Sequence, residues 1–166
     1  MIECIGKGGF GYVFRCAPRS THSATAPSSL SEEVAIKVLD KKRMNRAGLK
    51  KRVIQEVEIH SSLSHDNIVR FYSAWEDKMA VYVMMEYCPM GDLYSWISNH
   101  GACEDSSCRH IIKQIVEAIQ YLHSKKIMHR DLKLSNILIR KASREGELGS
   151  QSSIALCDFG LAVKLE

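Results

Sequence analysis

The sequence predicts an α+β fold in which a region rich in β-strands comes before a region rich in helices. Residues 1–16 and 34–40 combine apolar and β-branched residues with a glycine-rich turn, which is typical of strands. Residues 105–123 instead repeat apolar residues at helical spacing. Two short apolar runs, 137–139 and 154–157, then indicate a small hairpin.

The first half of the chain predicts strands with one inserted helix. Residues 1–16 form a hairpin around the glycines, and residues 19–33, rich in Ser, Thr, Ala and Pro, form a loop. A strand at 34–40 leads to a helix from about 46 to 63. A turn and a strand follow within residues 65–77. The helix is indicated by apolar residues at helical spacing: Leu49, Val53, Ile54, Val57 and Leu63.

Residues 80–88, AVYVMMEYC, predict a strand apolar enough to be buried on both faces. Residues 91–101 predict a short helix that Gly101 closes. The longer helix at 105–123 has three candidate N-cap residues: Asp105, Ser106 and Ser107. Its apolar stripe comprises Ile111, Ile112, Ile115, Val116, Ile119 and Leu122. The polar residues 141–153 join the last two strands as a hairpin loop.

The composition is that of an ordinary soluble globular protein: 166 residues, 45% apolar, 25% charged and a formal charge of +4. This modest charge does not favour a nucleic-acid partner. No apolar run approaches the roughly 18 residues that cross a bilayer, and the N-terminus lacks the apolar segment of a signal peptide. We therefore expect neither a nucleic-acid nor a membrane partner, and a cytoplasmic location.

Six cysteines, none in a C-x-x-C pair, make a zinc site improbable on spacing alone. Without an export signal, reduced thiols in the cytosol or nucleus are expected. Cys103 and Cys108 could still pair under oxidation, although two free thiols near a helix start are the simpler interpretation.

The segment GKGGFG, residues 6–11, matches G-x-G-x-x-G. A dinucleotide-binding version of this motif passes into a helix, whereas here the next residues, YVF, favour a strand. The glycines therefore belong to a hairpin whose backbone N–H groups can lie over phosphates, with Phe10 at its tip to screen water. A plain hairpin turn is the alternative.

Lys37 lies inside an apolar strand, where a lysine needs a partner because an unpaired buried charge is costly. Glu56, in the middle of the predicted helix, is the natural partner, and such a pair would aim the ammonium at phosphates. The alternative is that Glu56 faces solvent beside Lys51 and Arg52. Residues 41–52 hold seven basic residues and no acidic one, which indicates a solvated face or a site for a phosphorylated segment.

The segment HRDLKLSN, residues 129–136, places five polar residues between two apolar segments and matches H-R-D-L-x-x-x-N, and DFG follows at 158–160. With GKGGFGYV, VAIK and Glu56 before them, these motifs occur in the order found in eukaryotic protein kinases. The chain resembles that family over its whole length. The resemblance implies a bilobal fold, with an antiparallel β N-lobe and one key helix at 1–87 and the first part of a helical C-lobe at 88–166.

The resemblance implies an enzyme that uses ATP and Mg²⁺ to phosphorylate serine or threonine hydroxyls of a protein substrate. Asp131 accepts or orients the substrate hydroxyl proton, and Lys133 reaches the γ-phosphate and resembles the serine/threonine class. Asn136 and Asp158 hold two Mg²⁺ ions. Arg130 resembles the arginine of kinases switched by activation-loop phosphorylation.

The same resemblance implies a nucleotide pocket. Met85 resembles the residue at the back of the adenine pocket, the backbone of Glu86 and Cys88 bonds the adenine edge, and Asp92 approaches the ribose. The full set of nucleotide-binding residues is Ile5, Gly6, Lys7, Gly8, Gly9, Phe10, Gly11, Val13, Ala35, Lys37, Met85, Glu86, Cys88, Asp92 and Leu138. Core filling is the alternative for Met84 or Met85, and Cys157 is either a reactive thiol or a buried inert one.

Four further residues are implied to pack in the hydrophobic spine: His129, Phe159, His60 and Phe71. Residues 34–60 resemble the polo-like kinases, especially the Sak type, which acts in centriole duplication and implies a centriolar location. Gly11, where polo-like kinases usually have alanine, and Lys133, where the Sak type commonly has threonine, depart from that pattern, as do the long loops 19–33 and 141–153. Aurora-like, NEK-like and ULK-like kinases remain alternatives.

The sequence ends six residues after Gly160, before the activation segment and later helices of a family kinase domain. A fragment or an incomplete gene model is therefore expected, with Ile111, Ile115 and Leu122 partly exposed and with weak ATP binding and poor transfer by this chain alone. The alternative function is a catalytically silent module that binds nucleotide or a partner. The oligomeric state stays open.

Overall fold

The computed structural model describes residues 2–8, 11–17, 33–46, 49–144 and 146–165. The predictions for Gly9, Phe10 and nearly all of the loop 19–33 lie outside these residues. The chain divides into two compact units, one made of residues 1–51 and 71–87 and the other of residues 52–70 and 88–166. Each unit is described by itself.

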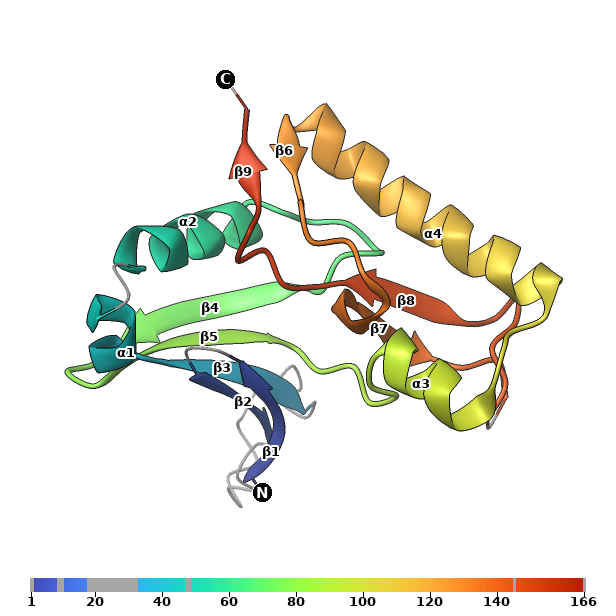
Figure 1. The fold of residues 1–166 in the computed structure, drawn as a ribbon, viewed down its shortest axis with the longest axis horizontal. Helices are drawn as coiled ribbons and strands as arrows, with labels where there is room; N and C mark the ends of the chain where they lie inside the picture. The colour runs from blue at the N-terminus through green and yellow to red at the C-terminus, as the bar shows by residue number, and fades with distance from the viewer. Residues whose placement is uncertain (1, 9–10, 18–32, 47–48, 145, 166) are drawn as a thin grey trace, which may run out of the picture. The chain divides into compact units, whose positions relative to one another are not determined.

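The first unit is built on an antiparallel five-stranded sheet with the strand order β1-β2-β3-β5-β4 (Figure 1). Its strands are β1 (Ile2–Gly8), β2 (Gly11–Cys16), β3 (Val34–Asp40), β4 (Phe71–Glu76) and β5 (Ala80–Glu86). The predicted N-terminal hairpin and the strand at 34–40 are confirmed, and the α+β class with them.

The two faces of this sheet differ in burial. One face buries Ala35, Leu39 and Val83, each less than 10% exposed. The other carries aromatic side chains in partly exposed positions, and Trp75 stacks on Tyr82 across β4 and β5 with ring centroids 5.4 Å apart. Within β5 only Ala80 and Val83, one on each face, are fully buried, and the other residues are half-buried, so the prediction that residues 80–88 are buried on both faces holds only in part.

The predicted helix at 46–63 is two helices, α1 (Lys41–Arg46) and α2 (Lys50–Ser61). The earlier start follows from Asp40, the last residue of β3, whose carboxylate accepts hydrogen bonds from the N–H groups of Lys42 and Arg43 at 2.7 and 3.0 Å. This contact caps α1 at the point where the strand ends. Apolar periodicity alone does not reveal such a cap.

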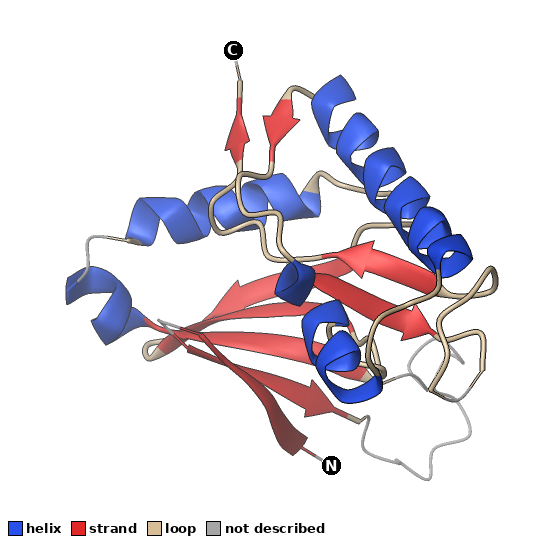
Figure 2. Ribbon diagram, turned by 45° about the vertical axis from the view of Figure 1, so that its right-hand side comes forward, coloured by secondary structure: helices blue, strands red, loops and turns tan. Residues whose placement is uncertain are grey.

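The second unit combines helices with short two-stranded sheets, and Figure 2 shows the β7–β8 hairpin among its helices. Most of α2 belongs to this unit. The other elements are α3 (Leu93–His100), α4 (Asp105–Ser124), β6 (Ile127–Met128), the 3₁₀ turn η2 (Leu134–Asn136), β7 (Ile137–Lys141), β8 (Ser153–Leu156) and β9 (Val163–Lys164). Helix α4 packs against β8 and β6.

The ends of the helices correct one prediction. Helix α3 ends at Gly101 as predicted, with a positive φ of 85°, and Asp92 caps its start. The N-cap of α4 is Glu104, not Asp105, Ser106 or Ser107. The Ser107 hydroxyl instead donates a hydrogen bond to the carbonyl oxygen of Leu148 at 2.5 Å, so that tertiary contact takes the side chain predicted as a cap.

The core of the second unit lies between α4, α3 and the β7–β8 hairpin. Ile111 and Leu122 are only 4% and 1% exposed, so the prediction of their partial exposure is wrong. Ile112 and Val116, which lie on another face of α4, are 58% and 44% exposed instead. No helix of the described residues is both long and apolar enough to cross a membrane.

Candidate active site

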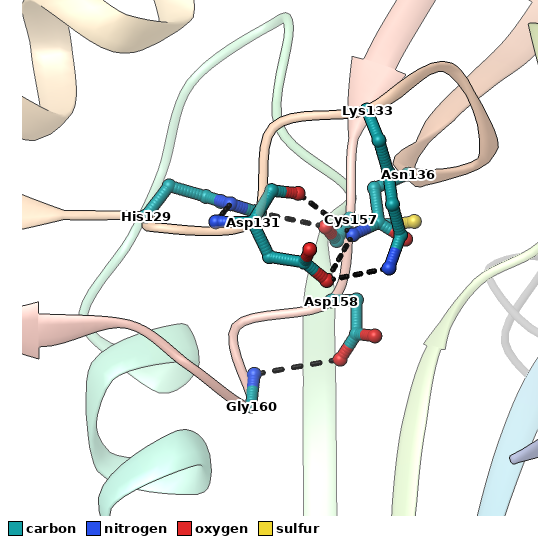
Figure 3. Close-up of polar contacts among 7 residues, drawn as sticks. All are labelled: His129, Asp131, Lys133, Asn136, Cys157, Asp158 and Gly160. Atoms are coloured by element: carbon teal, nitrogen blue, oxygen red, sulfur yellow. Dashed lines mark hydrogen bonds and ion pairs between the residues drawn. The ribbon is translucent and has the colours of Figure 1, made fainter.

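The residues of the HRDLKLSN segment converge on one carboxylate in the second unit (Figure 3). Lys133 Nζ donates a hydrogen bond to Asp131 Oδ2 at 2.7 Å. The amide nitrogen of Asn136 donates to the same oxygen at 2.9 Å and to the Asp131 carbonyl oxygen at 2.9 Å. We call Asp131, Lys133 and Asn136 the catalytic-loop cluster. The turn η2 brings Asn136 back towards Asp131, so sequence spacing and local geometry agree.

The charges of this cluster stabilise each other. The hydrogen bond from Lys133 is the main cause that lowers the pKa of Asp131, and the bond from Asn136 adds to it. The same bond raises the pKa of Lys133, with a further contribution from the nearby Asp158. The two side chains are 25% and 52% exposed. At neutral pH the pair is therefore an ion pair that a ligand can reach from solvent.

Two residues of the site have left-handed backbone conformations, which are rare for residues other than glycine. Arg130 has φ 64° and Asp158 has φ 63°. The Arg130 side chain donates from Nε to the Leu161 carbonyl oxygen at 2.7 Å, and the Gly160 N–H donates to Asp158 Oδ1 at 3.4 Å. Residues held in such conformations cluster at functional sites.

His129 connects the catalytic loop to the strand that precedes Asp158. Its Nδ1 accepts a hydrogen bond from the Asp131 N–H at 3.3 Å, so Nε2 carries the proton and donates to the Cys157 carbonyl oxygen at 3.0 Å. The Cys157 N–H in turn donates to the Asn136 carbonyl oxygen at 2.9 Å. Burial lowers the pKa of His129, which keeps the ring in the neutral form that this geometry requires.

Phe159 packs between two histidines, as the predicted spine requires. Its ring centroid lies 5.0 Å from that of His60 and 5.1 Å from that of His129, and the side chain is 1% exposed. Nε2 of His60 forms a hydrogen bond with the Val69 carbonyl oxygen at 2.7 Å. Phe71, the fourth predicted member, belongs to the first unit.

The Glu56 carboxylate on α2 approaches the DFG turn. A Cβ built on Gly160 would lie 3.4 Å from Glu56 Oε2 and 3.3 Å from Asp158 Oδ1. Glycine at this position therefore allows two carboxylates to lie close to one backbone segment. Lys37 belongs to the first unit, and its predicted pairing with Glu56 stays a prediction.

The acidic and amide groups fit a magnesium ion that arrives with phosphates. Because the Asn136 amide uses its nitrogen for both bonds to Asp131, its side-chain oxygen is the atom that it can offer a cation. Asp158 supplies a carboxylate on the adjacent turn (Figure 3). The described residues contain no group of three or more His, Cys, Asp or Glu that could hold a metal. One amide oxygen and one carboxylate suit Mg²⁺, which keeps waters and phosphate ligands.

The predicted glycine loop is a β-hairpin in the first unit. Gly8 pairs with Gly11 at its end, and the register shifts between Cys4 and Gly6, so that Ile5 lies at a bulge. A Cβ on Gly11 would lie 1.8 Å from the Val38 carbonyl oxygen. Close approach of β3 therefore favours glycine at this position.

The strand register places several predicted pocket residues on one face of this sheet. Val13 pairs with Lys37, and Ala35 pairs with Met85, so alternation gives all four the same side. Met84 points to the opposite side. Both methionines are half-buried, so the role of Met85 at the back of an adenine pocket and core filling by either methionine stay predictions.

The remaining pocket residues lie at or beyond the end of β5. Glu86 is the last residue of β5 and Cys88 is 5% exposed in the second unit. Asp92 uses both carboxylate oxygens to bond Ser95, at 2.9 Å to the N–H and 2.7 Å to the hydroxyl. The backbone of Asp92 also forms an isolated antiparallel β-bridge with Leu138 on β7. The structure thus gives Asp92 a capping role, and contact with a ribose stays a prediction.

Sequence reasoning missed a second polar group, the amide cluster of Gln114 and Asn67. Gln114 Oε1 accepts from Asn67 Nδ2 at 2.9 Å and from the Ile154 N–H at 3.0 Å, and its Nε2 donates to the Ser152 carbonyl oxygen at 3.1 Å. Both amides are 8% exposed. A glutamine on the core side of an apolar helix was the available signal.

Comparison with known proteins agrees with this geometry. The model of the protein kinase domain matches residues 1–166. The chain is 38% identical to Serine/threonine-protein kinase PLK4 of Drosophila yakuba over 98% of the chain and 19% of the relative. It is 37% identical to PLK4 of Xenopus tropicalis over 100% of the chain and 16% of the relative, and 38% identical to PLK4 of Nematostella vectensis over 99% and 15%. The chain thus spans less than a fifth of the length of these relatives.

Proposed function

The chain belongs to the protein kinase domain family, and on that premise we propose that it transfers the γ-phosphate of ATP to serine or threonine hydroxyls of protein substrates. The main support for this proposal is the catalytic-loop cluster, in which the ionised carboxylate of Asp131 accepts hydrogen bonds from Lys133 and Asn136 at 2.7 and 2.9 Å. Phosphoryl transfer depends mostly on positioning and on neutralising charge, and this cluster offers both.

Asp131 orients the hydroxyl of the substrate. Because its pKa is lowered, mainly by Lys133, the carboxylate is a weak base and a good hydrogen-bond acceptor. That suits a loose transition state, in which the hydroxyl proton leaves late. Lys133 is the cation closest to Asp131 and faces solvent, where it can meet the transferred phosphoryl group. A lysine at this position favours serine and threonine over tyrosine acceptors.

Asn136 and Asp158 are the residues proposed to hold Mg²⁺, which would neutralise phosphate charge when bound with ATP. In the first unit, the glycine hairpin, Val13, Ala35, Lys37 and Met85 are proposed to bind the nucleotide, and Glu56 to pair with Lys37. We also propose residues 1–87 as the N-lobe and 88–166 as the start of the C-lobe. The boundary between the two compact units also falls between residues 87 and 88, although residues 52–70 belong to the second unit.

The test is transfer from labelled ATP to matched serine, threonine and tyrosine peptides, measured on the longest expressed form of the protein. Phosphate on serine or threonine is expected, with little on tyrosine. Asp158→Asn should remove the Mg²⁺-dependent part of ATP affinity in a calorimetric titration, whereas Asp66→Asn, an exposed acid of the same unit, should retain it. Transfer to tyrosine alone would contradict the proposed substrate class. Nucleotide binding without transfer would favour a silent binding module.

The relatives support a narrower proposal, a kinase of the PLK4 type with a centriolar location. An identity of about 38% over the whole chain supports assignment to the PLK4 group. The proposal does not extend to the substrates and partners of those longer proteins. Lys133 departs from the threonine common in the Sak type. Fluorescent tagging of the natural protein and co-staining of centrioles tests the location, and a signal spread evenly through the cell would contradict it.

A further inference from the structure

Two cysteines flank the start of α4. Cys103 comes just before the N-cap residue Glu104, and Cys108 lies in the first turn, at the fourth helical position after the cap. Side chains at these two positions normally meet, because an apolar pair there fixes the angle at which the chain enters a helix. In this chain that contact pair is formed by two thiols.

The local bonds bring the thiols together. The Cys108 N–H donates to the Glu104 carbonyl oxygen at 2.9 Å, which closes the first helical turn. Cys108 Sγ lies 3.7 Å from the Cys103 carbonyl oxygen. Burial raises the pKa of Cys103, and the charge and hydrogen bonding of the nearby Cys108 thiol raise it further.

Cys103 and Cys108 are both partly exposed residues, and Cys103 packs one side against the core of the second unit. Cys4 and Cys16 do not form such a pair, because they face Phe14 and Ile2 across the β1–β2 ladder.

We propose that Cys103 and Cys108 form an oxidisable dithiol that closes to a disulfide with a low-molecular-weight disulfide such as oxidised glutathione. One thiolate attacks the glutathione disulfide, which forms a mixed disulfide and releases one glutathione thiolate. The second thiolate attacks the protein sulfur of that bond and expels the second glutathione. The chain loses two protons and two electrons, and one oxidised glutathione becomes two reduced molecules.

The bridge would stiffen a turn that also holds another part of the second unit. Ser107, between the two cysteines, bonds the carbonyl oxygen of Leu148, which is buried in the connection between β7 and β8. Closing the ring would therefore fix the first turn of α4 and the contact that this connection makes with it.

The experiment is oxidation of the chain with oxidised glutathione, followed by alkylation and cleavage by a glutamyl endopeptidase. That enzyme cuts after Glu104, between the two cysteines, so the resulting peptides stay together only if a disulfide joins them. We expect one joined pair, with a mass about 2 Da below the sum of the free peptides, that separates on reduction. A trivalent arsenical, which binds two close thiols at once, should protect both from alkylation.

Matched variants separate this proposal from general thiol reactivity. Cys103→Ser should leave Cys108 as a stable mixed disulfide with glutathione, and Cys108→Ser should do the same for Cys103. Cys4→Ser, an exposed thiol elsewhere, should leave the joined peptides unchanged. Separate glutathione adducts on both cysteines of the unmodified chain, or joining to other cysteines instead, would overturn the proposal. The arsenical result on the wild-type chain decides the matter if a variant fails to fold.

Discussion

The second unit contains two polar clusters that differ in charge, exposure and sequence separation. In the catalytic-loop cluster, Asp131 and Lys133 are charged and partly exposed, Asn136 is a buried amide, and all three lie within six residues of one another. The amide cluster of Gln114 and Asn67 is neutral and buried, and its bonds join segments 38 to 87 residues apart. The catalytic-loop cluster leaves charged groups accessible to a ligand. The polar groups of the amide cluster instead form hydrogen bonds with the protein backbone.

This difference separates groups that act on a ligand from groups that hold the fold. Gln114 and Asn67 bond Ile154 of β8 and Ser152 just before it, and the Leu156 N–H donates to the Asn67 carbonyl oxygen at 2.9 Å. Strand β8 leads directly to Asp158. The buried cluster therefore supports the strand that carries a proposed metal ligand, without offering any group to the ligand itself.

The largest effect is expected for Asp131→Asn. Turnover should fall by about 10²–10⁴-fold, because an amide cannot accept the hydroxyl proton. The free energy of unfolding should change little, since the carboxylate is partly exposed and its ion pair is solvated. Initial rates with a peptide acceptor, beside ATP affinity by calorimetry, measure both. Unchanged turnover would remove Asp131 from the proposed mechanism.

The second prediction concerns Gln114→Leu, which should lower stability by about 3 kcal/mol. Leucine keeps the volume but leaves the Asn67 amide, the Ile154 N–H and the Ser152 carbonyl oxygen without these partners. Urea denaturation measures the loss. Gln120→Leu, an exposed site on the same helix, should stay within about 0.5 kcal/mol of the wild type. Equal losses in the two variants would contradict the role assigned to the buried cluster.

The same contrast explains what the sequence could predict. The chemistry of the catalytic loop depends on residues close in sequence, so fixed spacing predicts Asp131, Lys133 and Asn136 together. The end of α3 at Gly101 is equally local, since its positive φ favours glycine. The polar partners of Gln114 lie far away in sequence, and no pattern within α4 identifies them.

The wrong predictions have tertiary causes. Helix periodicity did not reveal that the Asp40 carboxylate caps α1 directly after β3. Nor did it reveal that the Ser107 hydroxyl, predicted as a cap of α4, bonds the Leu148 carbonyl oxygen. Most residues of β5 are only half-buried although they are apolar, because burial depends on what covers each face. Composition alone does not contain that information.

A third prediction asks whether a glycine in the proposed nucleotide-binding hairpin serves the ligand or the fold. Gly11→Ala should lower stability by about 2 kcal/mol, because its Cβ would lie 1.8 Å from the Val38 carbonyl oxygen and the strands must move apart. Gly8→Ala is the matched control, since its Cβ would meet nothing nearer than 3.9 Å. Thermal denaturation without nucleotide measures both. Similar small losses would show that Gly11 has no special need for close approach.

The smallest effect is expected at His129, which lies beneath the exposed cluster and bonds both Asp131 and Cys157. Burial lowers its pKa in the folded chain, so the unfolded chain binds the proton at higher pH. Its stabilising contribution is therefore complete above the ordinary histidine value of about 6.5 and is lost as the pH falls below it.

Urea denaturation at pH 7.5 and 5.5 should thus show a loss of stability at the lower pH from this residue. His129→Gln should reduce that loss, because glutamine does not titrate. The variant should also be less stable than the wild type at pH 7.5, because it lacks the two hydrogen bonds of the histidine ring. His123→Gln, an exposed histidine on α4, should keep the wild-type dependence. If His129→Gln kept the full dependence as well, the neutral buried ring would not be the group that acid disrupts, and the support beneath Asp131 would have to come from the backbone bond between Cys157 and Asn136.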